Sequence, residues 1–137
     1  MFTPAEVFGR MRDNWLSDAP TFEGDLLADD VVIEMPFAAP GRPDRIVGRD
    51  AFEAFASAGR AALPIRFDGC RTTAVHETAD PEVIVVEYEL AATLTTTGVS
   101  ASAPFVGVLR VRDGRVAGWR EYQNPVAMAL ATGQPPP

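Results

Sequence analysis

Cysteine and histidine are almost absent from this chain, which limits the metal chemistry open to it. Cys70 is the single cysteine and His76 the single histidine among 137 residues. An intramolecular disulfide is therefore impossible, and a zinc site built from cysteine and histidine lacks its ligands. The acidic residues also lack the Asp/Asn/Gly spacing of a calcium loop. We expect neither a metal ion nor a cofactor.

Clustered basic residues and long apolar runs are missing as well. The formal net charge is −7, and the basic residues are scattered along the chain. Binding to phosphate groups needs clustered positive charge, so nucleic acid and anionic membranes are not expected as partners. No window approaches the roughly 18 apolar residues of a membrane span, and the chain opens on a helix-start signal rather than a leader. We expect a cytoplasmic protein.

The composition is that of an ordinary globular domain. Hydrophobic residues make up 47% of the chain and charged residues 23%. A domain of this length buries about two-thirds of its unfolded surface, which leaves room for a core and one internal pocket. We predict a single domain over residues 1–132, followed by a disordered tail at 133–137.

Helix signals are concentrated in the first half of the chain. Residues 3–6 (TPAE) combine an N-cap, a proline at the first helical position and a capping-box acid, which predicts a helix over 4–16. A short second helix is expected at 22–27. Asp50 begins another capping box, and a third helix is expected from there to Pro64.

Strand signals dominate the second half. Alternation predicts a first strand over 30–37 that places Met35 and Phe37 on one face, and the proline-rich segment 38–48 predicts a loop. The remaining predicted strands are 66–78, 83–97, 99–112 and 115–124. This order of elements predicts an α+β fold in which about three N-terminal helices pack on one face of a curved antiparallel sheet.

Four short motifs on these elements resemble the SnoaL-like branch of the nuclear transport factor 2-like superfamily. They are LADDV at 27–31, GRDA at 48–51, VRDGRV at 111–116 and EYQNP at 121–125. The resemblance implies a cone-shaped α+β barrel that encloses a hydrophobic pocket, and a homodimer formed through the outer face of the sheet. It implies no single reaction, because the family includes polyketide cyclases, ketosteroid isomerases, epoxide hydrolases, dehydratases and proteins without catalysis.

Ketosteroid isomerase chemistry is not expected. Members with that activity use a carboxylate base after the first strand, a tyrosine on the first helix and a protonated aspartic acid on the penultimate strand. The resemblance places Met35, Met11 and Gly107 at those three positions. Glu34 adjoins the first of them, but a shift by one residue would turn it to the opposite face of the sheet.

Strand alternation selects the candidate site residues. The even positions of 83–97 are mostly apolar and are expected to face inward, and the Asp113-Gly114 turn then places Trp119, Glu121 and Gln123 inward on the last strand. Glu121 is the only carboxylate on that inner side, where desolvation would raise its pKa and suit it to proton transfer. Glu121 and Tyr88 are the candidate catalytic residues. The candidate ligand-binding residues are Met11, Trp15, Met35, Phe37, Phe55, Tyr88, Leu90, Phe105, Trp119 and Gln123.

Each of these assignments has an alternative. The apolar residues could be ordinary core, and Glu121 could form a structural ion pair with an arginine. His76 is expected to be exposed beside a turn, and Cys70 to be a small core residue. The outer face is expected to carry cross-strand ion pairs or a dimer surface, formed by Arg110, Arg112 and Arg120 with Glu87 and Glu89.

Three functions remain open on this evidence. The first is an enzyme that isomerises, cyclises or hydrates a small apolar carbonyl or polyketide-like compound, with Glu121 as acid or base and Tyr88 or Gln123 orienting the substrate. The second is a non-catalytic binding or accessory protein for a small apolar ligand. The third is a structural dimer whose interior is filled by side chains.

Overall fold

The fold is an α+β arrangement in which helices flank one six-stranded sheet. A computed structural model describes residues 1–17, 24–62, 65–131 and 133. Its elements, in chain order, are α1 (Pro4–Leu16), β1 (Leu27–Glu34), β2 (Arg45–Val47), α2 (Arg49–Ala62), β3 (Ile65–Glu77), β4 (Val83–Leu94), β5 (Ser100–Arg112), β6 (Arg115–Tyr122) and α3 (Pro125–Ala131).

Helix α1 begins where its sequence signal predicts. The Thr3 hydroxyl accepts a hydrogen bond from the Glu6 backbone N–H, and the Glu6 carboxylate accepts one from the Thr3 N–H at 3.0 Å. These two bonds satisfy backbone donors that a helix N-terminus otherwise leaves without a partner. The predicted helix over 4–16 is confirmed.

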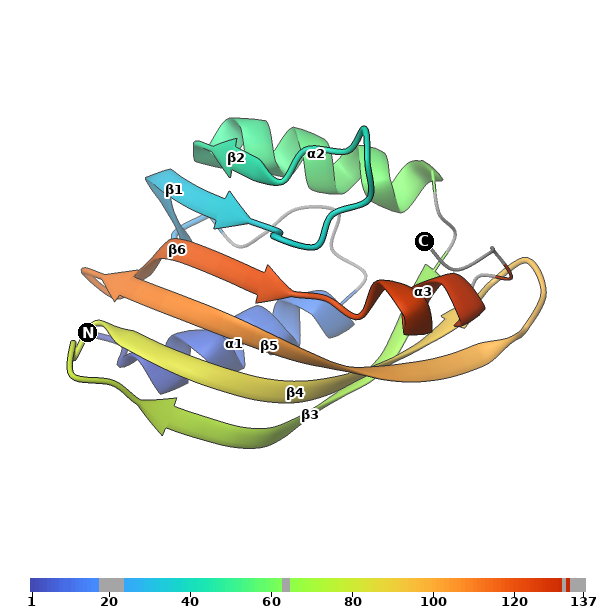
Figure 1. Cartoon of the computed structure of the whole chain (residues 1–137). Coiled ribbons are helices and arrows are strands. Elements are labelled where there is room, and N and C mark those ends of the chain that lie inside the picture. Colours follow the sequence, from blue (N-terminus) through green and yellow to red (C-terminus); the bar gives the residue numbers. More distant parts are fainter. Residues whose placement is uncertain (18–23, 63–64, 132, 134–137) are drawn as a thin grey trace.

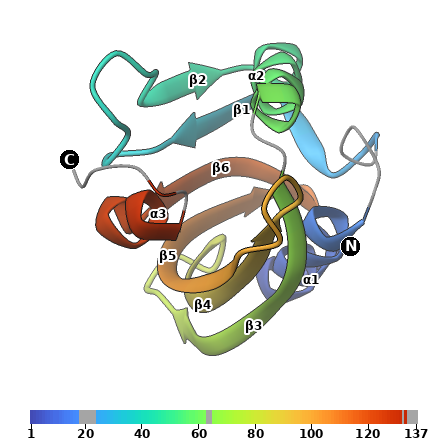
Figure 2. The same cartoon turned by 90° about the vertical axis from the view of Figure 1, so that its right-hand side faces the viewer.

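The strands follow the order β2-β1-β6-β5-β4-β3. All neighbouring pairs are antiparallel except β1 and β6, which are parallel. The sheet is strongly curved, as Figure 2 shows, and it does not close into a barrel because β2 and β3 remain its two edges.

Helices α1 and α2 pack against different parts of the sheet. Figure 1 shows α2 running beside β1 and β2, while α1 crosses behind β3, β4 and β5. The Phe8 ring of α1 lies 5.6 Å from Tyr88 of β4 and 6.1 Å from Trp119 of β6. The sheet face that carries Tyr88 and Trp119 is therefore the one covered by helix, and we call it the inner face.

The structure corrects the expected helices at two places. The helix expected at 22–27 lies partly outside the described residues, and within the described part residues 24–26 form a turn and Leu27 begins β1. A helix that was not expected, α3, follows β6. Its first turn is capped by Asn124, whose side-chain oxygen accepts from the Ala127 N–H at 3.0 Å. Of the predicted tail, only Gly133 is described.

The first strand and the loop after it also differ from expectation. β1 ends at Glu34, three residues before its predicted end, because the chain then turns at Pro36 and Phe37. Within the predicted loop, β2 pairs antiparallel with β1, with Ile46 opposite Ile33. No helix in the described part of the chain has both the length and the hydropathy to cross a membrane.

Candidate functional site

The predicted phase of the long strands is confirmed. On β4, Val86 and Tyr88 are almost fully buried, whereas Glu87 and Glu89 are partly exposed. On β5, the buried positions include Phe105 and Leu109, and on β6 they include Trp119. Glu121 and Gln123 follow Trp119 at steps of two and therefore share the inner face.

Glu121 is held by two side chains of the inner face. The Tyr88 hydroxyl donates a hydrogen bond to Oε2 of Glu121, and Nε2 of Gln123 donates to Oε1 at 3.0 Å. Both carboxylate oxygens thus accept hydrogen bonds from neutral donors. Among the described residues, no arginine forms the ion pair with Glu121 that was the alternative. This arrangement fixes the carboxylate in one orientation on the inner face.

Tyr88 is the most deeply buried member of this group, with 1% of its surface exposed. Burial raises the pKa of its hydroxyl far above the ordinary value, and the charge of Glu121 and the hydrogen bond to it act in the same direction. Tyr88 therefore stays protonated throughout the physiological pH range and is available as a hydrogen-bond donor.

An aromatic cluster surrounds the ring of Tyr88. The Tyr88 ring stacks on Phe105 with 5.5 Å between centroids and lies 5.6 Å from Trp15. Trp119 covers Gly107, since a Cβ built on that glycine would lie 2.0 Å from Cη2 of the indole. Position 107, where the resemblance would place the isomerase aspartic acid, has no room for any side chain while Trp119 keeps this position.

The inner face opens towards solvent at one end. β1, β4 and β6 run in the same direction, because β6 is parallel to β1 and antiparallel to β5, which is itself antiparallel to β4. Along all three, inward side chains change from buried to partly exposed at that shared end. The changes run from Ile33 to Met35, from Tyr88 to Leu90 and from Trp119 to Glu121 and Gln123.

The residues expected to line a pocket divide into two groups. Met11, Tyr88, Phe105 and Trp119 belong to the buried core. Trp15, Met35, Phe55 and Leu90 pack against that core but keep partial exposure, as does Gln123. Glu121 lies at the boundary between the two groups, so a molecule at the open end could reach its carboxylate.

Phe37 is not an inner-face residue, contrary to expectation. Its side chain is 54% exposed, and its ring meets Tyr122 edge-on with 5.6 Å between centroids. Tyr122 alternates with Glu121 and so belongs to the outer face of β6. The prediction was wrong because it extended β1 past Glu34, and the turn that follows takes Phe37 out of the strand alternation.

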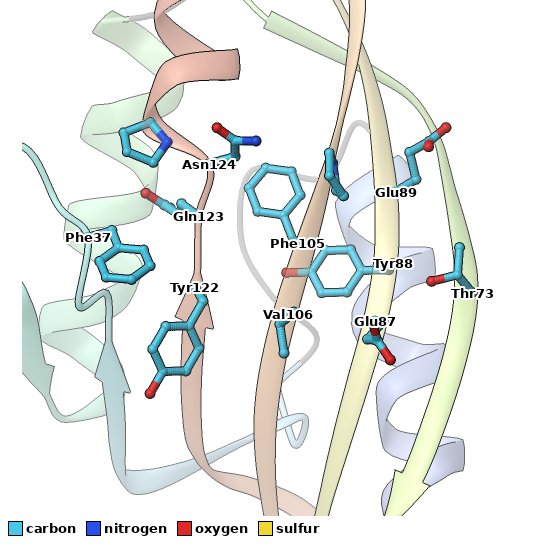
Figure 3. Close-up of a pocket in the computed structure, with 12 residues that line it drawn as sticks. Phe37, Thr73, Glu87, Tyr88, Glu89, Phe105, Val106, Tyr122, Gln123 and Asn124 are labelled. Atoms are coloured by element: carbon cyan, nitrogen blue, oxygen red, sulfur yellow. The ribbon is translucent and has the colours of Figure 1, made fainter. Parts of the chain in front are cut away.

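Phe37 and Tyr122 border a hollow of about 590 Å³ that is lined mainly from the outer face. Figure 3 shows these two rings at one side, Val106 between them and β4, and Glu87 and Glu89 towards the other side. The hollow therefore lies across four neighbouring strands. Its lining includes four of the predicted ligand-binding residues, Phe37, Tyr88, Phe105 and Gln123, although the sequence placed them around an inner cavity.

The outer face carries the expected charged side chains, but several partners differ. Glu87 lies 2.6 Å from Nε2 of His76, and Glu89 lies 3.6 Å from Arg71. The expected arginines pair elsewhere: Arg110 with Asp80 and Glu82, Arg112 with Asp30 and Arg120 with Glu34. His76 is exposed beside a turn, as predicted, whereas Cys70 is only partly buried among core residues.

The fold and this inner face define the class of protein. The sequence profile of the SnoaL-like domain matches residues 10–119, and the chain belongs to that family. An uncharacterised PhzA/B-like protein of Pseudomonas aeruginosa is 31% identical over 109 residues, which cover 80% of this chain and 75% of that protein.

Solved structures agree on the fold. A putative isomerase from Bacillus subtilis superposes with a TM-score of 0.86 at 23% identity, covering 96% of this chain and 94% of its own. A Delta 5-3-ketosteroid isomerase from a Mycobacterium species gives a TM-score of 0.73 at 25% identity, covering 92% and 97%. The fold thus occurs in small-molecule enzymes, and the family relation selects no particular reaction.

Proposed function

We propose that this chain is a cofactor-independent enzyme that moves a proton on a small apolar carbonyl compound of the polyketide-like kind. The observation that carries the proposal is the Glu121 carboxylate, which is held by Tyr88 and Gln123 where the aromatic cluster meets the open end of the inner face. A carboxylate base beside an apolar wall suits this chemistry, because it can accept a proton from a carbon acid that binds against that wall.

The proposed reaction begins with transfer of a proton from the carbon next to the carbonyl to Glu121. The electron pair of the broken C–H bond moves into the carbonyl group and gives an enolate. Once Glu121 is protonated, it needs the Tyr88 hydrogen bond less, and the Tyr88 hydroxyl can donate to the enolate oxygen instead. In an isomerisation, the enolate is conjugated with a neighbouring C=C bond, and Glu121 returns the proton to the far carbon of this dienolate. In a cyclisation, the enolate carbon bonds to the carbon of a second carbonyl, the π electron pair of that carbonyl moves to its oxygen, and Glu121 returns the proton to the resulting alkoxide.

Exchange of the acidic C–H protons for deuterium tests this proposal without knowledge of the natural substrate. In D2O, the wild-type protein should accelerate exchange at the α-carbon of apolar ketones such as 2-tetralone, which NMR detects. Glu121→Gln should lower the protein-dependent rate by about a hundredfold or more, the usual contribution of a general base. Glu87→Gln, which removes a carboxylate from the outer face of β4, should leave the rate unchanged.

Two results would contradict the catalytic proposal. One is equal exchange by wild type and Glu121→Gln, with thermal melts showing that both are folded. The other is tight ligand binding by both proteins without exchange or product. The second result would favour a non-catalytic binding protein. That function is supported by the residues Met35, Met11 and Gly107, which stand where ketosteroid isomerases have their carboxylate base, tyrosine and aspartic acid.

We also propose that two copies associate through the outer face. Support comes from the exposed Phe37 ring and from Val106 and Tyr122 beside it, an apolar strip bordered by charged residues. Val106→Asp should convert a dimer into a monomer in size-exclusion chromatography with light scattering, because it buries a carboxylate directly opposite Glu87, where like charges repel. Val47→Asp, on an exposed site of edge strand β2, should remain dimeric. A monomeric wild type would contradict this proposal.

A further inference from the structure

Arg12 of α1 is partly buried and extends towards β3. Its position follows the buried Met11, and its Nη1 lies 3.5 Å from Oγ1 of Thr72, at the outer limit of a hydrogen bond. A guanidinium has five N–H donors, and within the described residues this one long contact engages a single donor.

No carboxylate of the described chain lies within ion-pair distance of Arg12. Neighbouring arginines differ in this respect, since Arg10 pairs with Asp25 at 2.9 Å and Arg66 pairs with Asp68 at 2.9 Å. Partial burial of a cation costs free energy unless a counter-charge or strong acceptors compensate it. The structure thus holds a positive group whose natural complement is an anion.

The contact of Arg12 with Thr72 places its guanidinium next to the strand position that pairs with Tyr88. Thr72, which Arg12 contacts, stands directly opposite Tyr88 in the β3–β4 register, and Cys70 stands opposite Leu90 one step further. Burial raises the pKa of the Cys70 thiol, while the charge of Arg12 lowers it and that of Glu121 raises it. The cation and the carboxylate therefore both act on the same half-buried thiol at the open end of the inner face.

We propose that Arg12 receives the anionic end of the ligand, so that the substrate is a small apolar carboxylic acid that also carries a ketone. The proposal rests on the proposed function for the position of the ligand. A planar guanidinium can hold both oxygens of a carboxylate, which fixes one end of the molecule while its apolar body lies against Trp15 and Leu90. Arg12 is then a specificity-determining residue, and Glu121 acts on the carbon skeleton.

Two probes of equal shape test this assignment by calorimetric titration: 2-naphthoate and its neutral analogue 2-naphthamide. Wild type should bind the naphthoate at least about tenfold more tightly, and Arg12→Gln should remove that preference while leaving naphthamide affinity unchanged. Arg71→Gln is the matched control. It removes the same charge one residue from Thr72, but on the outer face where Arg71 pairs with Glu89, and it should keep the preference.

Further variants separate this proposal from the catalytic one. Glu121→Gln should bind the naphthoate as tightly as wild type or more tightly, because a like charge has been removed. If a protein shows no exchange activity but keeps the naphthoate preference, the proposed catalytic role of Glu121 fails while the assignment of Arg12 stands. Should Arg12→Gln fail to fold, Arg12→Lys is the second variant. It keeps a positive charge but lacks the planar guanidinium that binds both carboxylate oxygens, so it should retain part of the preference. Equal affinity of wild type for both probes, or an unchanged preference in folded Arg12→Gln, would overturn the assignment.

Discussion

Replacement of Gly107 by alanine should lower the free energy of unfolding by about 3 kcal/mol, the upper end of the usual cost of overpacking a core. The added Cβ would lie 2.0 Å from Cη2 of Trp119 and 2.6 Å and 2.7 Å from two further atoms of that ring. The indole cannot move aside easily, because it is buried and packs against Phe8 and Tyr88.

Urea denaturation monitored by tryptophan fluorescence would measure this loss. Gly69→Ala is the matched control, since it adds the same methyl group to β3, where nothing lies within 4 Å of the new atom, and its stability should change by less than about 1 kcal/mol. A double variant that combines Gly107→Ala with Trp119→Leu should be less destabilised than the sum of the single variants, since the smaller side chain relieves the clash. A Gly107→Ala protein as stable as wild type would show that Trp119 does not occupy this space.

The same contact leaves no space at position 107 for the aspartic acid of the isomerases. The sequence shows only a glycine at position 107, which could have meant an empty place in a pocket. In the structure, Trp119 from the neighbouring strand fills the place, so the glycine and the tryptophan form one packing unit. Glu121, one step beyond Trp119 on the inner face of β6, stands directly opposite Gly107 in the β5–β6 register.

The phase of the last two strands depends on a turn and on a bulge, and only the turn has a local sequence signal. Asp113 and Gly114 have φ angles of 55° and 74°, the left-handed pair that a tight hairpin of this kind requires. The turn pairs Val111 with Val116, but a register shift follows, so that Leu109 pairs with Trp119 instead of Gly118. Alternation from Val116 across the turn alone would have put Glu121 on the outer face, so its inward orientation depends on this bulge.

Other features could not be predicted, because their stabilising contacts are distant or their signals are short. β2 has three residues and exists through its pairing with β1, so no periodicity in the sequence could reveal it. α3 did have a signal, an Asn124 cap followed by Pro125 at the first helical position, but it lay close to a tail that was expected to be disordered. Arg12 gave none, because its relation to Thr72 depends on how α1 crosses β3.

Alkaline pH should destabilise this protein more steeply than its composition suggests, and Tyr88 is the reason. The pKa of a tyrosine in an unfolded chain is about 10, and burial raises the pKa of Tyr88 well above that value. Below pH 10 both states keep the proton, so Tyr88 adds no pH dependence. Above it the unfolded chain releases a proton that the folded protein keeps, and stability should fall by about 1.4 kcal/mol per pH unit.

The titration range is unusually clear, because the chain contains no lysine and only two tyrosines. Burial also raises the pKa of the Cys70 thiol, which acts in the same direction, so all proteins compared should carry Cys70→Ala. Urea unfolding at each pH from 8 to about 12 should show Tyr88→Phe less stable at pH 8, since it loses the hydrogen bond to Glu121, but with a shallower decline above pH 10. Tyr122→Phe, on the partly exposed outer face, should decline as steeply as wild type. If Tyr88→Phe and Tyr122→Phe decline with the same slope, the hydroxyl of Tyr88 is open to solvent, and Glu121 does not have the buried donor that the proposed proton transfer requires.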